Sequence, residues 1–259
     1  DNDNQFNYRF AESLGVDPWT AGELKLLRAM EAGPTSAETP ALVRGYVTST
    51  GVDAYWYVSG DDMQRITDAS VVSVIAGAGN TIWDITSSGQ TYFLATANGI
   101  SSGVATGAPT TQYSGTYDSS AIIEFVKGRL IFAHENNVYQ LLVAPSGPPA
   151  ALPTEIYAHQ DPDWTWKSIT DGPNAIYVAG DSGTTSEIHR FAPTISGTGV
   201  PELGWVGVTA TMPLGEVINA MYQYVGSFVG IATNKGFRVL RVRHRSGSGL
   251  TAPLDIVQG

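Results

Sequence analysis

A fivefold internal repeat is the feature that most limits what this chain can fold into. Each unit starts with a strand-like segment rich in aromatic and β-branched residues, passes through a short polar turn, and ends in a second strand-like segment. This order is typical of a β-hairpin. The first segments of the five units are residues 54–60, 91–96, 128–134, 175–180 and 227–233.

A small residue closes the first segment of every unit. These residues are Ser59, Ala95, Ala133, Ala179 and Ala232, in steps of 36, 38, 46 and 53 residues. Units of about 35–50 residues with several strands each predict a β-propeller, whose blades converge on an axis where bulky side chains do not fit. A β-sandwich is the alternative, although its strands recur every 8–12 residues or so without a longer period.

The predicted fold class is therefore all-β, a β-propeller with five visible repeat units. Residues 42–50 and the C-terminal tail would help to form a sixth blade. The sequence begins at Asp1 and not at Met, and it has no charged-then-apolar secretory segment, so we expect a processed or truncated chain. A longer chain would allow seven blades.

Residues 1–41 differ from the propeller at residues 42–259 and are predicted to form an N-terminal arm. Thr20 and Glu23 have the spacing of a capping box, with Thr20 as the N-cap. Apolar residues follow at helical spacing until Gly33 and Pro34 end the pattern. The arm is therefore predicted to contain one short helix, over residues 21–32, and then a linker, over residues 33–41.

Composition excludes several classes of protein. The chain has 8 Phe, 6 Trp and 12 Tyr, which is too many aromatic residues for a disordered chain, and 29 Gly and 14 Pro, which indicate many turns. Without cysteine it cannot form disulfides or thiolate metal sites. No apolar run approaches the roughly 20 residues of a membrane helix. The net charge of −10 argues against nucleic acid binding over the whole surface.

No catalytic constellation emerges from the motifs. Gly180-Asp-Ser-Gly183 resembles the nucleophile loop of trypsin-like proteases, but Gly-Pro does not follow it and no matching histidine segment precedes it. The same stretch resembles an Asp-box turn of sialidases without the closing aromatic residue. The carboxylate pairs Asp61-Asp62 and Asp161-Pro-Asp163 occur in turn-like sequence, so solvated turns are the favoured interpretation.

Metal and cofactor sites are not predicted either. Asp1-Asn-Asp-Asn4 and Asp161-Pro-Asp163 have oxygen ligands at alternate positions, which would suit calcium, but no EF-hand pattern follows. The four histidines have no ligand spacing between them; they are His134, His159, His189 and His244. We therefore predict no catalytic residue, no metal ligand and no cofactor.

Two other features are candidates for contact with a ligand or partner. Trp164 and Trp166 would share one face of a strand, either exposed to stack on a sugar or, as we favour, buried between blades. Basic residues gather near the C-terminus, and their alternation predicts one charged stripe. The stripe would either protect an edge strand or dock onto an acidic neighbour; it consists of Lys235, Arg238, Arg241, Arg243 and Arg245.

Two stretches carry a family resemblance. One is the unit at residues 128–141 (GRLIFAHENNVYQL), and the other is residues 233–242 followed by a Gly/Ser turn and residues 250–254. Together they resemble the propeller region of minor tail proteins from siphophages of actinobacteria, and 4 Lys against 10 Arg suits a high-GC source. The resemblance implies a virion component at the tail tip or baseplate. It defines no catalytic residue.

These observations lead to one main hypothesis and two alternatives. The main hypothesis is a non-enzymatic structural or adhesion component of a phage tail, extracellular when free and assembled as a homo-oligomer around the tail axis. Its partners would be other tail proteins and a cell-surface glycan, with no nucleic acid and no membrane span. The alternatives are a propeller glycosidase, marked by two carboxylates at the channel mouth, and a lectin, marked by exposed Trp164 and Trp166.

Overall fold

The computed structural model describes most of the chain from Leu42 to Leu250 and two short strands before it. The described residues are 16–17, 25–26, 42–67, 70–75, 80–142, 149–172, 175–195, 201–224, 228–242 and 248–250. Within them the protein is all-β and forms five four-stranded antiparallel sheets. No helix among these residues has the length and apolar character needed to cross a membrane.

Each sheet is one blade, built from strands that follow one another in the sequence. Blade 1 contains β3 (Leu42–Val47), β4 (Asp53–Ser59), β5 (Asp62–Ile66) and β6 (Val71–Ile75). Blade 2 contains β7 (Ile82–Ser88), β8 (Thr91–Thr96), β9 (Gly99–Val104) and β10 (Thr110–Ser114). Blade 3 contains β11 (Ile122–Val126), β12 (Arg129–His134), β13 (Asn137–Leu141) and β14 (Tyr157–Ala158). Blade 4 contains β15 (Thr165–Gly172), β16 (Ala175–Asp181), β17 (Ser186–Ile195) and β18 (Pro201–Thr211). Blade 5 contains β19 (Ile218–Tyr224), β20 (Phe228–Thr233), β21 (Gly236–Val242) and β22 (Ser248–Leu250).

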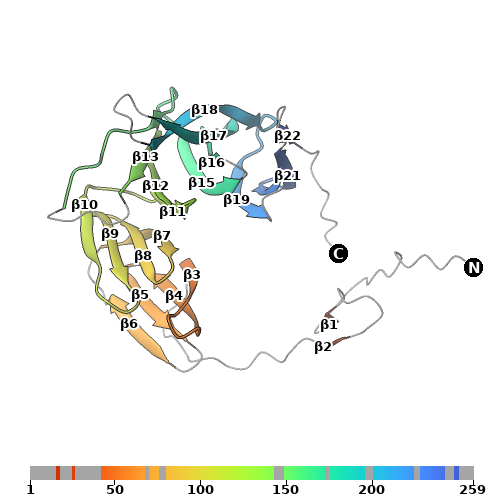
Figure 1. The fold of residues 1–259 in the computed structure, drawn as a ribbon. Helices are drawn as coiled ribbons and strands as arrows, with labels where there is room; N and C mark the ends of the chain where they lie inside the picture. Colours follow the sequence, from red (N-terminus) through yellow and green to blue (C-terminus); the bar gives the residue numbers. More distant parts are fainter. Residues whose placement is uncertain are drawn as a thin grey trace, which may run out of the picture.

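The blades stand around a common axis, with β3, β7, β11, β15 and β19 innermost (Figure 1). This arrangement is a five-bladed β-propeller, as the repeat predicted. The repeated hairpin is the second and third strand of each blade, and residues 42–47 form the innermost strand of the first. Two-residue turns such as Ala97-Asn98 and Asn234-Lys235 connect the hairpin strands.

Four hydrophobic clusters join the five blades. We call the side of a blade that faces the next blade in sequence its trailing face, and the opposite side its leading face. Because side chains alternate along a strand, each blade can present apolar residues on both faces. One cluster each joins blades 1 and 2, 2 and 3, 3 and 4, and 4 and 5. No cluster of described residues joins blade 5 to blade 1, and the ring is open between them (Figure 1).

The small residues of the repeat lie on the trailing faces and not on the innermost strands. Ala95, Ala133 and Ala179 belong to the second strands of blades 2, 3 and 4 and are fully buried against the next blade. In blade 1 the matching position is Val58, which pairs with Leu42 as Ala133 pairs with Ile122, so the assignment to Ser59 was one residue too late.

The helix predicted for residues 21–32 is contradicted where the structure describes it. Lys25 and Leu26 form β2 (Lys25–Leu26), which pairs with β1 (Val16–Asp17) in an antiparallel ladder. A helix of about 12 residues is marginal without tertiary packing, so strand pairing can outweigh a capping box. The remaining residues of the predicted helix lie outside the described part of the chain.

Replacing a trailing-face alanine tests the packing between blades. We expect Ala133→Leu to lower the free energy of unfolding by about 1–3 kcal/mol, because added methylenes must force apart a filled interface. Ala232→Leu is the matched control: this alanine has the same place in blade 5 but is exposed, so its effect should stay within about 0.5 kcal/mol. Urea unfolding followed by tryptophan fluorescence measures both. Equal losses would contradict the assignment of the trailing face.

Candidate functional site

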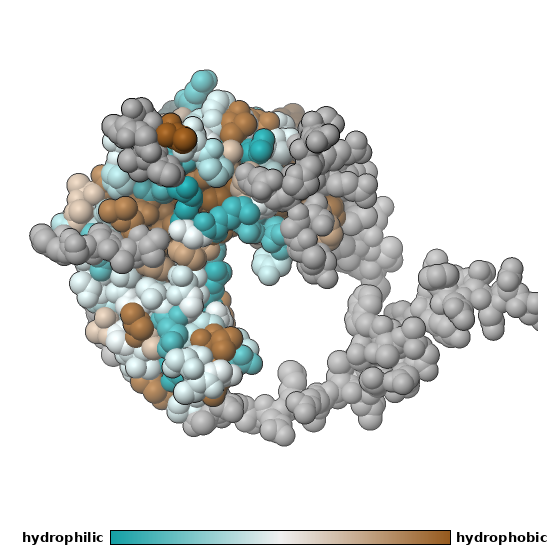
Figure 2. Space-filling view, viewed as in Figure 1, coloured by the Kyte–Doolittle hydropathy of each residue, from teal (hydrophilic) through white to brown (hydrophobic). Residues whose placement is uncertain are grey.

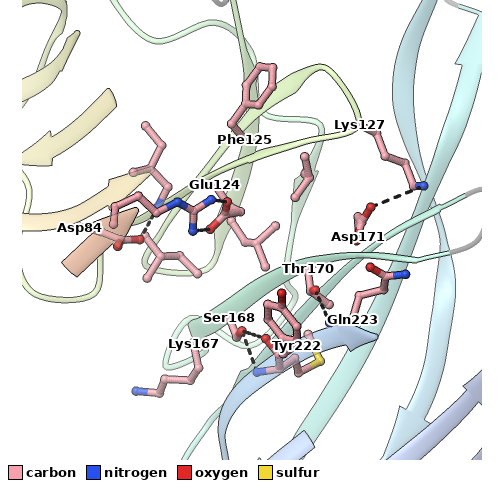
Figure 3. A pocket seen from close by; sticks show the side chains of 16 residues that line it. Asp84, Glu124, Phe125, Lys127, Lys167, Ser168, Thr170, Asp171, Tyr222 and Gln223 are labelled. Atoms are coloured by element: carbon pink, nitrogen blue, oxygen red, sulfur yellow. Dashed lines mark hydrogen bonds and ion pairs between the residues drawn. The ribbon is translucent and has the colours of Figure 1, made fainter. Parts of the chain in front are cut away.

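The central channel is the main cavity that the innermost strands enclose. It has a volume of about 470 Å³ and is lined from β3, β7, β11, β15 and β19. Its lining is largely polar, and polar side chains gather along the inner rim of the ring in Figure 2. Figure 3 shows the side chains that enter it. The charged members are Arg44, Asp84, Glu124, Lys127, Lys167 and Asp171.

Short oxygen-bearing side chains connect the innermost strands of neighbouring blades. In blade 2, Asp84 Oδ2 accepts a hydrogen bond from the backbone N–H of Ile123 (2.8 Å), and Thr86 Oγ1 accepts one from Phe125 (2.9 Å). Innermost strands of different blades are not paired in one sheet, so these bonds satisfy N–H groups that would otherwise face the channel unpaired. We call such a pair of acceptors a latch.

Blade 4 repeats this latch with different residues. Ser168 Oγ accepts from the N–H of Met221 (2.9 Å), and Thr170 Oγ1 accepts from that of Gln223 (3.1 Å). Ser168 pairs across its blade with Ala179 as Asp84 pairs with Ala95, so the two latches occupy equivalent positions. The pattern Asp84-x-Thr86 and Ser168-x-Thr170 was readable in the sequence, but only the blade register gives it meaning.

An arginine of blade 1 spans the first three blades. The guanidinium of Arg44 donates both to the carboxylate of Glu124 and to Thr86 Oγ1, and the Thr86 hydroxyl donates to Glu124 Oε1 (2.9 Å). Arg44 and Glu124 are partly buried, at 35% and 22% side-chain exposure. Charge-assisted bonds to both carboxylate oxygens fix the carboxylate in place. Glu124 is therefore held by partners from blades 1 and 2.

Asp84 is the most perturbed acid of the channel. Its pKa is raised from 3.8 to about 7: burial raises it most and the charge of Glu124 adds to this, while the N–H groups of Ile123 and Ile85 and the charge of Arg44 act in the opposite direction. At neutral pH, Asp84 thus exchanges a proton while Glu124 lies beside a cation. Two carboxyl groups with such different surroundings are the arrangement that acid–base chemistry uses.

The other charges of the channel have partners within the fold. Lys127 Nζ lies 3.8 Å from Asp171 Oδ2, which connects blades 3 and 4, and Lys167 Nζ lies 3.9 Å from Asp181 Oδ2. The lysine side chains are 34% and 40% exposed, so solvent screens both pairs and they contribute little to stability. They leave the channel close to charge balance although the chain as a whole is acidic.

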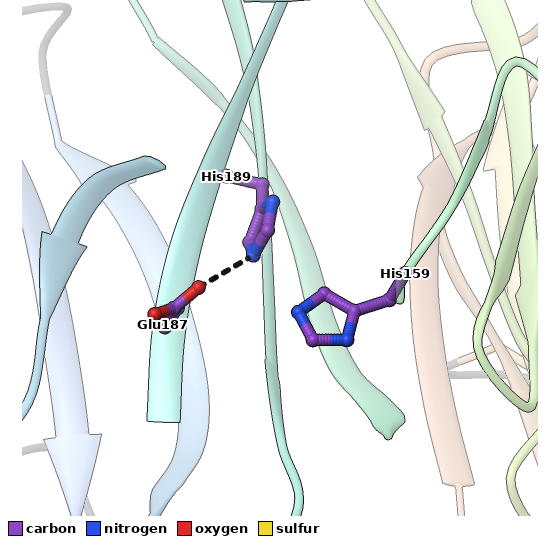
Figure 4. A group of neighbouring side chains, drawn as sticks. All are labelled: His159, Glu187 and His189. Carbon is purple, nitrogen blue, oxygen red and sulfur yellow. Dashed lines mark ion pairs between the residues drawn. The ribbon is translucent and has the colours of Figure 1, made fainter. Parts of the chain in front are cut away.

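A second group of titratable side chains lies on blade 4 and the segment that enters it. One nitrogen each of His159 and His189 and one oxygen of Glu187 lie within 4.8 Å of one another (Figure 4). Glu187 and His189 are two residues apart on β17, and His159 follows β14. No ligand spacing is visible in the sequence, because His159 lies 28 residues before Glu187, in the segment between blades 3 and 4.

The hydrogen bonds of this group do not fit a metal ion. His189 Nδ1 accepts from the indole N–H of Trp205 (3.0 Å), and His159 Nδ1 accepts from the backbone N–H of Asp161 (3.1 Å). Burial, together with the charge of His159, lowers the pKa of His189 to about 4, so its ring is neutral and its proton is on Nε2, 3.2 Å from Glu187 Oε2. A histidine that binds metal through Nε2 needs the reverse polarity, with Nδ1 as donor, and here Nδ1 of both rings is already occupied as an acceptor.

Trp164 and Trp166 are buried, as the favoured interpretation predicted. Their exposed fractions are 2% and 1%, and both belong to the cluster between blades 3 and 4. Trp164 also stacks on His159, with ring centroids 3.9 Å apart. Neither can offer an open face to a sugar, so the prediction of a glycan contact at these two residues is wrong.

The basic stripe is not a single surface. Arg238 is 6% exposed and donates to both carboxylate oxygens of Glu216, which is 3% exposed. This bond holds the pKa of Glu216 below its usual range. Strand β21 pairs with β22 at residues 240–242 as well as with β20, so it is not an edge at Arg241, and the edge-protection interpretation is wrong there. Lys235 is exposed in a turn; the side chains of the remaining members, Arg241, Arg243 and Arg245, lie outside the described part.

The motifs that resembled catalytic loops lie in turns. Asp181 ends β16, and its Oδ1 accepts the N–H of Gly183 (2.9 Å), which makes the Gly-Asp-Ser-Gly stretch an Asx turn. Asp161 accepts the N–H of Asp163 in the same way (3.0 Å). The carboxylates of Asp181 and Asp161 therefore stabilise turns. The Asp1–Asn4 stretch and His244 lie outside the described residues.

Comparison with known proteins supports the fold alone. No protein-family model and no curated protein matches the chain. Among solved structures it is similar to a streptogramin B lyase (16% identity, TM-score 0.52, covering 81% of this chain and 67% of that one). It is also similar to apo AztD from Citrobacter koseri (6%, 0.50, 80% and 60%) and to the Swd1 β-propeller domain from Myceliophteria thermophila (13%, 0.48, 74% and 66%). The chain thus spans about two thirds or less of these proteins, and such identities establish only a β-propeller.

The raised pKa of Asp84 predicts a pH dependence of stability. Between about pH 4 and pH 7 the unfolded chain has released this proton while the folded chain still binds it, so the free energy of unfolding should fall as pH rises. Because one pKa unit is worth about 1.4 kcal/mol, the loss is at most about 4 kcal/mol. Asp84→Asn should remove this part of the slope, whereas Asp53→Asn, at an exposed strand end, should not. Urea unfolding across that range measures the slopes, and identical slopes would contradict the assignment.

The Arg238–Glu216 pair predicts a large loss of stability on truncation. Arg238→Ala leaves a buried carboxylate without its cation and should cost about 3 kcal/mol. Lys235→Ala removes an exposed charge three residues away and should change stability by less than about 0.5 kcal/mol. Thermal or urea unfolding compares the two variants. Similar small effects would instead support a surface role for Arg238.

Proposed function

We propose that this chain is a non-enzymatic structural or adhesion component of a bacteriophage tail tip or baseplate. The proposal rests first on the resemblance of residues 128–141 and 233–254 to siphophage minor tail proteins. It places the protein in the virion, among other tail proteins and in several copies around the tail axis, with a host-surface glycan as a further contact.

The observation that carries the proposal is the exposure of apolar residues at the two ends of the ring. Val43, Val47 and Tyr55 of blade 1 are 57%, 58% and 49% exposed, and Tyr222 of blade 5 is 76% exposed. Apolar groups gathered on one surface favour contact with another protein. The channel supports a structural role as well, because Glu124, Lys127 and Lys167 each have an ionic partner within the fold.

Labelled virions test this function. We expect an antibody against this chain to decorate the tail tip in electron micrographs of intact particles, and the chain to co-purify with particles through a density gradient. Antibody against a major capsid protein is the control for particle integrity. A label found only in host cytoplasm, with none on particles, would contradict the proposal.

A propeller glycosidase is the second candidate, and one observation favours it. Asp84, with a pKa of about 7, and Glu124, the ion-pair partner of Arg44, are both in the channel. In glycoside hydrolysis a protonated carboxyl acts as the acid while a second carboxylate acts as base or nucleophile. Hydrolysis of host-wall polysaccharide that is lost in both Asp84→Asn and Glu124→Gln but kept in Asp171→Asn would favour this candidate.

A further inference from the structure

The leading face of blade 1 is open where every other leading face is buried. Val43 is 57% exposed, whereas its counterparts on the other innermost strands are between 1% and 8% exposed; these are Ile85, Ile123, Ile169 and Met221. Tyr55 on the second strand is 49% exposed, against at most 1% for its counterparts Tyr92, Leu130, Ile176 and Val229. In blades 2 to 5 the preceding blade covers these positions.

The trailing face of blade 5 shows the same difference. Ala232 is exposed, although the residues that take its place in blades 1 to 4 are fully buried; these are Val58, Ala95, Ala133 and Ala179. Tyr222 on β19 is 76% exposed, whereas Thr86 and Thr170, at its position in blades 2 and 4, are 0% and 7% exposed. Both ends of the ring therefore carry the side chains of a blade interface without the second blade.

Comparison with the latches shows which hydrogen-bond acceptors blade 5 does not offer to blade 1. Blades 2 and 4 offer two short acceptors to the next blade, but the equivalent residues of blade 5 are Ala220 and Tyr222. Alanine has no acceptor, and a tyrosine hydroxyl stands at the far end of a rigid ring, so blade 5 has no latch. The N–H groups that a latch would meet on blade 1 are those of Val43 and Gly45, and no described side chain accepts from them.

We propose that the gap between blade 5 and blade 1 is an interface for a further β-sheet from a neighbouring subunit of the assembly. That sheet would present an apolar trailing face to Val43 and Tyr55 and an apolar leading face to Tyr222 and Ala232. Its innermost strand would carry Asp, Ser or Thr at two alternate positions, which accept from Val43 and Gly45. This inference rests on the proposed role as an assembly component.

A second copy of this chain does not meet these requirements. The open trailing face of a second copy is again that of blade 5, which has Ala220 and Tyr222 where the acceptors must stand. Its blades 2 and 4 have latches, but these are already engaged by blades 3 and 5. A second copy is thus excluded as the occupant, and we commit to a sheet of different sequence that continues the ring; residues 1–41 of this chain are the other occupant that the labelling below tests.

Single cysteines test the gap in the isolated chain of residues 1–259, which has no cysteine of its own. We expect Val43→Cys and Tyr222→Cys to react with a maleimide at rates within about threefold of Ile195→Cys, which is at a 73% exposed residue at the end of β17 in blade 4. Labelling at least tenfold slower at 43 or 222 would mean that the face is already covered. Repeating the labelling in a chain that lacks residues 1–41, and measuring mass by light scattering, then tells whether the arm or a second copy covers it. Either result would overturn the proposal.

The assembled particle provides the other half of the test. In intact virions we expect the cysteines at 43 and 222 to label at least tenfold more slowly than the one at 195. Val43→Lys and Tyr222→Lys should lower incorporation into particles at least tenfold, and Ile195→Lys should not. Full incorporation of both lysine variants would overturn the inference and leave the proposed function intact. If the unmodified chain is missing from particles, the proposed function fails, and with it this inference.

Discussion

The structure depends on the burial of both faces of each blade against its neighbours. A four-stranded sheet with apolar residues on its two sides cannot be stable alone, because one face would remain in water. Blades 2, 3 and 4 solve this with clusters on both sides, while blades 1 and 5 each have one. Tight contact also limits side-chain size, which explains the alanines at 95, 133 and 179.

Hydrogen bonds at the axis complement this packing. Innermost strands of adjacent blades approach one another without forming a common sheet, so their N–H groups that face the channel need acceptors from side chains. Asp84, Thr86, Ser168 and Thr170 provide them. The pKa of Asp84 is raised in this position, because burial removes the water that would solvate its ionised form. The ionised carboxylate would nevertheless be the better acceptor.

Local sequence signals were enough to predict the hairpins, because turn residues and alternating apolar residues act over a few positions. The channel could not be predicted, since Asp84 is 40 residues after Arg44 and Glu124 another 40 after Asp84, and the three meet only through the blade register. The alternating basic residues around Arg238 predicted an exposed stripe. Arg238 is instead buried, because it pairs with the buried carboxylate of Glu216. The helix prediction failed at Lys25 and Leu26. A capping box favours a helix only locally, and here the two residues pair with another strand instead.

An interrupted ring is thermodynamically a linear array and not a cycle. In such an array each unit is stabilised by its nearest neighbours, so the terminal units have half the interfaces of the central ones and open first. Blade 1 is more stable than a terminal unit with one interface would be, because Arg44 reaches across blade 2 to Glu124 in blade 3. Local unfolding should therefore begin at the blade 5 end, and filling the gap would convert fraying ends into one cooperative unit.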